Sequence, residues 1–263
     1  MTEPQPVSPK IQLIRYTPHP DQLVASAAKL CYASDTELVL DQTDEKAANF
    51  VRRLKKLGHM SPIEHVSFTF YIEGISRACT HQLVRHRIAS YSQRSQRYVK
   101  HDSFEYIIPP QLEGKKLEID GVELDVAAYY HETMKMLSER YSVLNKMLGD
   151  TGETSNEDAR YILPNACETK IFMTVNAREL LHIFEERLCL RAQWEIRRVT
   201  DEMLALVKPV CPAIFENAGP KCVRLGYCPE GKMTCGKFKE MIGRYAVSST
   251  DKHKTSVQDA KAE

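Results

Sequence analysis

The residues best suited to chemistry lie in one basic stretch in the first half of the chain. Between Glu73 and Asp102 there is no acidic residue, and the stretch holds nine cationic or imidazole side chains. These are Arg77, Arg85, Arg87, Arg94, Arg97, Lys100, His81, His86 and His101. Guanidinium forks, with the serine, tyrosine and glutamine side chains between them, are the donors that phosphate oxygens accept. We therefore expect a site for a phosphorylated small molecule.

Composition alone leaves two alternatives for this stretch. It could be a solvated basic face or an ion-pair network, or it could bind nucleic acid with Tyr91 and Tyr98 as stacking residues. The charge of the whole chain gives no general attraction to polyanions, because 36 Lys and Arg balance 35 Asp and Glu to a net charge of +1. Any anion site must therefore be local.

The elements that position these residues follow from hydrophobic periodicity. Apolar residues recur at helical spacing over 21–33, 44–57, 76–87, 122–148, 177–190 and 192–207. Alternation predicts strands over 66–72 and 169–175, and Gly58 is placed to end the second helix. Ser61 to Glu64 has the form of a capping box. We expect a mixed α/β (α+β) fold, a helix-rich single domain with long helices packed on a small sheet.

Composition divides the chain into three segments. We expect the main domain over 1–210, a Cys/Gly/Pro-rich segment over 211–247 and a disordered polar tail over 248–263. The N-terminus is polar, and no stretch has the ~18 apolar residues that cross a bilayer. These features predict a cytoplasmic protein with no membrane partner.

The order of residues in the basic stretch resembles a known signature. Arg85-His86-Arg87, followed after seven residues by Ser95 and then by Arg97, is similar to the RHR-x7-S-x-R motif of the flavin-dependent thymidylate synthases. Three further segments, 59–65 (HMSPIEH), 174–178 (TVNAR) and 192–195 (AQWE), resemble other segments of that family. The G-x-G-x-x-G and P-loop motifs do not occur, and neither does the Pro-Cys-His of the cysteine-dependent synthases.

The resemblance implies an enzyme that methylates dUMP to dTMP. In the family, 5,10-methylenetetrahydrofolate donates the carbon, and NADPH supplies the hydride through FAD. The implied partners are dUMP and folate, with no nucleic acid. Two rival functions stay open: a nucleic-acid-binding module, and a flavoprotein that methylates another nucleotide. The preferred nicotinamide and the order of the chemical steps also stay open.

The resemblance assigns roles residue by residue. Arg187 is implied as the catalytic residue, because a guanidinium at the uracil edge stabilises negative charge as it develops. The residues implied to bind FAD or to lie beside it are His59, Ser61, Arg85, His86, Arg87, Gln93, Asn176, Arg178 and His182. Those implied to bind dUMP are Gln82, Arg85, Gln93, Arg94, Ser95, Gln96, Arg97, Arg160 and Arg187. For Ser95 we expect a phosphate-binding hydroxyl rather than a nucleophile.

Four positions depart from the family pattern, and one helix suggests oligomerisation. Ser92, Gln93, His182 and Arg191 stand where other residues are usual, and the implied ligand contacts of Gln93 and His182 depart most from the pattern. On the helix from residue 177, Arg187 shares a side with Asn176, whereas His182 points elsewhere. A helix that serves more than one site suits the family's homotetramer, in which active sites form between subunits.

The eight cysteines fall into two groups. Cys31, Cys79, Cys167 and Cys189 lie in periodic segments, and we expect them to be small buried apolar residues. Cys211, Cys222, Cys228 and Cys235 crowd the Gly/Pro-rich segment. Their spacing lacks a C-x2-C pair, so metal binding, a redox or disulfide role and plain thiols all stay open. At the nucleotide site no metal ligand is assigned.

Overall fold

The computed structural model describes residues 3–34 and 43–246. The chain divides into two compact units. Unit 1 comprises Met1–Ile11, Tyr71–Arg85 and Ser90–Met173, and unit 2 comprises Gln12–Phe70, His86–Ala89 and Thr174–Glu263. Within the described ranges, no helix is both long enough and apolar enough to cross a bilayer. The predicted tail at 248–263 lies outside these ranges.

The main sheet has four strands, β1 (Lys10–Tyr16), β2 (Ser67–Ser76), β3 (Ala89–Gln93) and β6 (Glu168–Asn176), in the order β1-β2-β6-β3. The predicted alternation in β2 is confirmed, since Phe68, Phe70 and Ile72 are fully buried. The strand continues to Ser76, past the predicted end, and Gly74 within it adopts a φ of +70°. A Cβ there would lie 2.1 Å from the Ser8 carbonyl oxygen.

Besides its sheet residues, unit 1 contains the helices α4 (Arg77–Leu83), α5 (Val126–Met147) and α6 (Glu153–Ala159) among its described residues. It also contains two short 3-10 turns, Pro110–Leu112 and Arg160–Ile162. A hairpin of β4 (Lys116–Ile119) and β5 (Val122–Asp125) precedes α5. The helix predicted over 122–148 therefore begins four residues late. Asp120 and Gly121 make the turn at positive φ, and the Asp125 carboxylate caps α5 by accepting from the Ala128 N–H at 2.9 Å.

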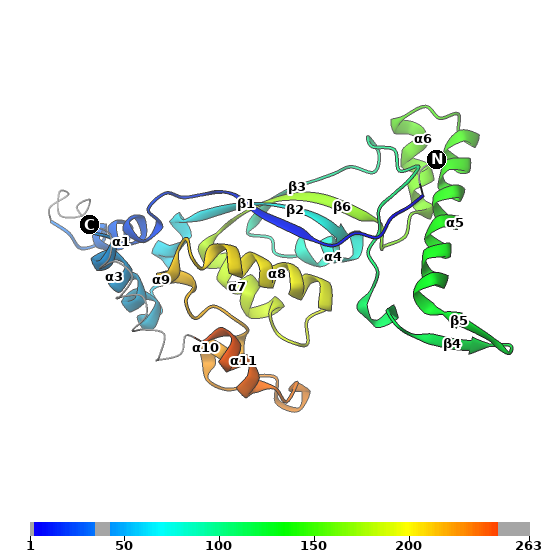
Figure 1. The fold of residues 1–263 in the computed structure, drawn as a ribbon. Coiled ribbons are helices and arrows are strands. Elements are labelled where there is room, and N and C mark those ends of the chain that lie inside the picture. The colour runs from blue at the N-terminus through cyan, green and yellow to red at the C-terminus, as the bar shows by residue number, and fades with distance from the viewer. Residues whose placement is uncertain (1–2, 35–42, 247–263) are drawn as a thin grey trace, which may run out of the picture. The chain divides into compact units, whose positions relative to one another are not determined.

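Among the described residues of unit 2 the helices are α1 (Pro20–Leu30), α3 (Asp44–Leu57), α7 (Ala177–Arg187), α8 (Trp194–Val207) and three short ones, α9 (Pro212–Phe215), α10 (Lys221–Leu225) and α11 (Phe238–Tyr245). Helices α7 and α8 lie side by side (Figure 1). Phe215 packs edge-on against Phe68 and Phe184, with ring centroids 5.5 and 5.8 Å apart. Gly58 ends α3 at a φ of +79°, as predicted.

Two local predictions are wrong. Ser61 does not cap a helix, because the segment Ser61–His65 is a single 3-10 turn whose cap position is Met60. The helix expected over 76–87 ends at Leu83, and β3 follows from Ala89. Its start is well defined, since the Ser76 hydroxyl accepts from the Cys79 N–H at 3.0 Å. The shorter helix leaves Arg85, His86 and Arg87 in a turn between α4 and β3.

Candidate active site

In unit 2, helix α7 surrounds the imidazole of His86 with three of its side chains. Asn176 is the N-cap of this helix, and its side-chain oxygen accepts a hydrogen bond from the Glu179 N–H at 2.8 Å. Arg187 Nε donates to His86 Nε2 at 2.9 Å, and a Glu179 carboxylate oxygen lies 3.6 Å from His86 Nδ1. The rings of His86 and His182 meet edge to face at 6.0 Å. Although helical geometry turns His182 and Arg187 in different directions, both reach the same ring.

His86 is neutral at neutral pH. Its side chain is 6% exposed, and burial, followed by the charges of Arg187 and His182, lowers its pKa to about 4. Since Nε2 accepts from Arg187, the ring proton lies on Nδ1, the nitrogen that faces Glu179. Burial in turn raises the pKa of Glu179. The contact between His86 and Glu179 is therefore polar rather than an ion pair.

The same cluster has the residue types of a metal site. The ligand atoms of His86, Glu179 and His182 lie within 4.8 Å of one another. A cation held there would also face the Arg187 guanidinium, which already uses His86 Nε2 as its acceptor. Charge repulsion from Arg187 thus disfavours a metal ion and favours an anionic or electron-rich organic ligand.

The other unit 2 residues expected near a flavin form a mostly exposed donor set. His59, Ser61, Arg87 and Arg178 are exposed. Arg178 is paired with Glu64, an exposed pair that solvent screens. Asn176 uses its oxygen to cap α7, which leaves its amide nitrogen as the donor for a ligand. Cationic and neutral donors of this kind fit the pyrophosphate of FAD.

In unit 1, the end of β3 places the side chains of Gln93 and Arg94 against helix α4 and strand β6. Gln93 Nε2 donates to the hydroxyls of Thr80 and Thr169 at 3.0 and 3.2 Å. Arg94 Nη2 donates at 2.7 Å to Glu168, whose carboxyl also accepts from the Gly74 N–H at 2.9 Å. Arg94 Nε is buried and has no hydrogen-bond partner among the described residues. Arg94 thus keeps one donor for an anion.

The hydroxyl and amide residues that follow have local partners. Ser95 Oγ accepts from the backbone N–H of Arg97 at 3.1 Å and from that of Tyr98 at 3.4 Å. No base contacts this hydroxyl among the hydrogen bonds of the described residues, which agrees with a binding role. Gln96 makes a weak contact with the Cys167 sulfur at 3.8 Å. Gln82 is half-buried and Arg85 is exposed.

Arg97 has two carboxylate partners on α6. Its guanidinium lies 2.7 Å from Glu153 and 2.9 Å from Glu157, and the Glu157 carbonyl accepts from Arg160 Nε at 3.2 Å. The two arginines expected to bind phosphate are therefore brought together by one short acidic helix. Sequence reasoning missed Glu153, Glu157, Glu168 and Glu179 because their partners are distant in the chain.

The cysteines differ from the expectation at two positions. Cys79 and Cys167 are buried as expected, whereas Cys31 is exposed and Cys189 is half-buried. Cys211 is fully buried, and its thiol donates to the Asp21 carboxylate at 3.3 Å. Burial raises the pKa of Cys211. Cys211 thus contacts Asp21 and lies outside the cavity that Cys222, Cys228 and Cys235 line.

Comparisons with known proteins agree with these motifs. Residues 12–213 match the family model described as thymidylate synthase complementing protein. The chain is 51% identical over 238 residues to a flavin-dependent thymidylate synthase of Clostridium tetani, which covers 88% of this chain and 95% of that protein. It is 40% identical over 252 residues to the flavin-dependent thymidylate synthase of Pyrococcus horikoshii, covering 90% and 99%.

A solved structure supports the fold. The crystal structure of the UMP/dUMP methylase PolB from Streptomyces cacaoi, bound with 5-Br dUMP, matches with a TM-score of 0.65 at 23% identity, over 80% of this chain and 94% of that one. With the family model matched over 12–213 and relatives at 40–51% identity along most of their length, the chain belongs to the family of flavin-dependent thymidylate synthases.

Proposed function

We propose that this chain converts dUMP to dTMP, with 5,10-methylenetetrahydrofolate as the carbon donor and NADPH as the source of the hydride. The proposal rests on family membership together with one observation, the hydrogen bond between Arg187 and His86. That bond uses Nε of the guanidinium and leaves the two terminal amino groups to donate to a ligand. An anchored fork of this kind suits the planar edge of a uracil ring.

The electrostatic role of Arg187 follows from the state of His86. Because His86 is neutral at neutral pH, it accepts from Arg187 without adding a second positive charge. The guanidinium is thereby held in place by a buried group that is 6% exposed. In the proposed reaction Arg187 stabilises the negative charge that develops on the uracil as C5 attacks, and it transfers no proton itself.

FAD, when bound, would supply the hydride that completes the methyl group. We assign it to the residues predicted from the resemblance, with His86, Arg87, Arg178 and His182 as the main donors of unit 2. The Asn176 amide nitrogen and the Ser61 hydroxyl add neutral donors. Positive charge at Arg87 and Arg178 balances the pyrophosphate, and His59 adds a further exposed donor.

For dUMP we assign Gln82, Arg85, Gln93, Arg94, Ser95, Gln96, Arg97, Arg160 and Arg187. Arg94 Nε is a buried donor without a partner in the described residues, as expected for a group that awaits an anion. Arg97 and Arg160 lie together beside α6. The phosphate of dUMP can share Arg97 with Glu157, because the guanidinium has five N–H donors.

The proposed enzyme is a homotetramer with active sites between subunits. The support is that α7 carries residues assigned to two ligands, since Arg178 and His182 are assigned to FAD and Arg187 to dUMP, as suits a helix that serves more than one site. Sedimentation equilibrium of the full chain tests the assembly. A protein that stays monomeric at assay concentration while it forms dTMP would contradict it.

The experiment that tests the function starts from the purified protein with FAD. Anaerobic NADPH is added with and without dUMP, the flavin absorbance is followed, and dTMP is measured after methylenetetrahydrofolate is added. UMP in place of dUMP tests the other acceptor named for the PolB methylase. We expect dTMP from dUMP, and a loss on the order of 100-fold in kcat for Arg187→Lys, which keeps the charge but loses the fork. Flavin that is never reduced, or the absence of dTMP, would contradict the proposal.

A further inference from the structure

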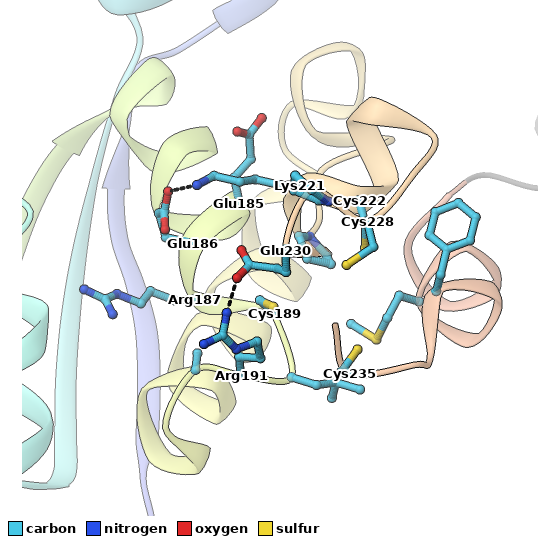
Figure 2. A pocket seen from close by; sticks show the side chains of 16 residues that line it. Glu185, Glu186, Arg187, Cys189, Arg191, Lys221, Cys222, Cys228, Glu230 and Cys235 are labelled. Carbon is cyan, nitrogen blue, oxygen red and sulfur yellow. Dashed lines mark hydrogen bonds and ion pairs between the residues drawn. The ribbon is translucent and has the colours of Figure 1, made fainter. Parts of the chain in front are cut away.

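Four cysteines line one cavity of unit 2. Cys189 follows α7, Cys222 lies in α10, and Cys228 and Cys235 lie in the loops between α10 and α11. The cavity between them has a volume of about 220 Å³. Figure 2 shows the sulfurs of Cys189, Cys228 and Cys235 turned toward the same space. All four are free thiols, and none is fully buried. The proposed reaction uses none of them.

Three ion pairs fix the segment that carries these thiols against the end of α7. Lys221 pairs with Glu186, and Arg224 pairs with Glu185. On the other side of Cys189, Arg191 pairs with Glu230, between Cys228 and Cys235 (Figure 2). Each partly exposed pair contributes no more than about 1 kcal/mol. Together the three pairs hold the two segments so that Cys189, which is 33 residues before Cys222 in the chain, lines the same cavity as the other three cysteines.

The cavity wall combines thiols with apolar side chains. Cys189, Cys222, Cys228 and Cys235 all line it. As thiolates they would repel one another, and a bound cationic centre would remove that repulsion. Phe238 and Met241 also line the cavity, so its wall is apolar on one side.

The spacing of the sulfurs distinguishes the kind of centre. A zinc ion with four thiolates holds its sulfurs about 4 Å apart, given Zn–S bonds of about 2.3 Å. Among the described residues, His86, Glu179 and His182 form the one group of three or more possible metal ligands whose ligand atoms all lie within 4.8 Å of one another. The sulfurs of Cys189, Cys222, Cys228 and Cys235 include no such group of three, so they are spread more widely than a single zinc ion requires. A cubane cluster binds each thiolate on a separate iron and therefore spans a wider set of sulfurs around a cavity.

We propose that Cys189, Cys222, Cys228 and Cys235 bind a [4Fe–4S] cluster. On binding, each thiol loses its proton to solvent and forms one Fe–S bond, and no cysteine changes oxidation state. The assignment replaces Cys211 of the sequence-based group with Cys189, since Cys211 is occupied by Asp21.

The test is anaerobic assembly on the full-length protein. An equimolar mixture of ferric and ferrous iron is supplied with sulfide, because the oxidised cubane contains equal numbers of both ions. After desalting we expect about four irons and about four acid-labile sulfides per chain. Dithionite reduction should give the electron paramagnetic resonance signal of a reduced cluster. Iron and sulfide analysis is needed because FAD absorbs in the same visible region.

Variants separate this site from the other thiols. Cys189→Ser and Cys235→Ser should each lower the bound iron at least several-fold while circular dichroism keeps the helical signal. Cys31→Ser, at an exposed thiol outside the cavity, and Cys211→Ser should keep the iron of the parent protein. Three results would overturn the proposal: full iron in Cys189→Ser, zinc bound in place of iron, or a disulfide among these cysteines in the protein as isolated. None of these readouts measures dTMP, so they are independent of the proposed reaction.

Discussion

Arg187 Nε donates a 2.9 Å hydrogen bond to Nε2 of His86, a buried histidine whose pKa is lowered to about 4. The two residues are separated by 101 positions in the chain, and the resemblance to the family assigned a role to each of them. The bond explains why a histidine stands between two arginines in the turn before β3. A neutral acceptor fixes the guanidinium, whereas a lysine or arginine at position 86 would repel it.

We expect His86→Ala to impair catalysis through Arg187. A hydrogen bond to a charged group is worth about 1.5–3 kcal/mol, which corresponds to a loss on the order of 10- to 100-fold in kcat/KM for dUMP. His19→Asn is the control, because His19 is outside the proposed site and at a φ of +46° that asparagine tolerates. Steady-state rates of dTMP formation by the parent protein and the two variants give the kcat/KM values to compare. An unchanged kcat/KM in His86→Ala would remove the positioning role.

His86 also makes stability depend on pH. Its folded pKa of about 4 lies below the ordinary value of 6.5, so the unfolded chain binds the proton more readily. The folded state therefore loses stability as pH falls through 6.5, and the loss is complete below about 4. For this side chain the complete loss is about 3 kcal/mol, of which about 2 kcal/mol falls between pH 7 and pH 5.

Urea unfolding at pH 7 and at pH 5 measures this effect. His86→Gln, which cannot titrate, should lose less stability over that interval than the parent protein. If both proteins lose the same free energy of unfolding, other groups are responsible for the pH dependence.

The sequence predicted elements where one signal was unambiguous. Helix α3 shows helical spacing together with a terminal glycine, and both its start at Asp44 and its end at Leu57 agree with the structure. Over 122–125 the apolar residues Val122 and Leu124 fit a strand as well as a helix, so periodicity could not place the hairpin before α5. The turn at Asp120 and Gly121 pairs this segment with β4, so residues 122–125 form a strand rather than the first turn of the helix.

The candidate site was predicted in its residue types but not in its partners. The family resemblance supplied His86 and Arg187, whereas their mutual hydrogen bond is a long-range contact. Cys211 is near Cys222 in sequence, yet burial against Asp21 takes it away from the cavity. Cys189 enters the cavity because ion pairs bring two distant segments together. The spacing of residues along one segment does not indicate which distant segment that segment will contact.

Gln93 stands where the family pattern has glutamate, and its contacts explain why the amide suits this chain. Its Nε2 donates to the hydroxyl of Thr80, which itself donates to the Arg77 carbonyl at 2.9 Å. A carboxylate at position 93 would face the lone pairs of Thr80. We therefore expect Gln93→Glu to destabilise the protein by about 1–2 kcal/mol at pH 7, and less at pH 5 where protonation restores a donor.

Thermal and urea unfolding at both pH values test the Gln93 prediction. The matched control is Gln111→Glu, at an exposed position, which should change the free energy of unfolding by less than about 0.5 kcal/mol. If Gln93→Glu is as stable as the parent protein at pH 7, the Thr80 hydroxyl has reoriented to donate to the carboxylate.

Arg97 is both an assigned phosphate ligand and the partner of two carboxylates. Glu153 and Glu157 lie 2.7 and 2.9 Å from its guanidinium, with all three side chains about 40% exposed. A phosphate that binds Arg97 must compete with these charges. We expect the double change Glu153→Gln and Glu157→Gln to tighten dUMP binding about five-fold, which corresponds to about 1 kcal/mol for partly exposed charges.

Titration calorimetry with dUMP at two salt concentrations measures the affinity directly. The double variant should bind dUMP more tightly than the parent protein, with a larger loss of affinity as salt is raised. Glu132→Gln, at an exposed position on α5, removes a charge away from Arg97 and should leave the affinity unchanged. Weaker binding in the double variant would mean that the two carboxylates hold Arg97 in its binding orientation, so that their positioning effect outweighs their charge.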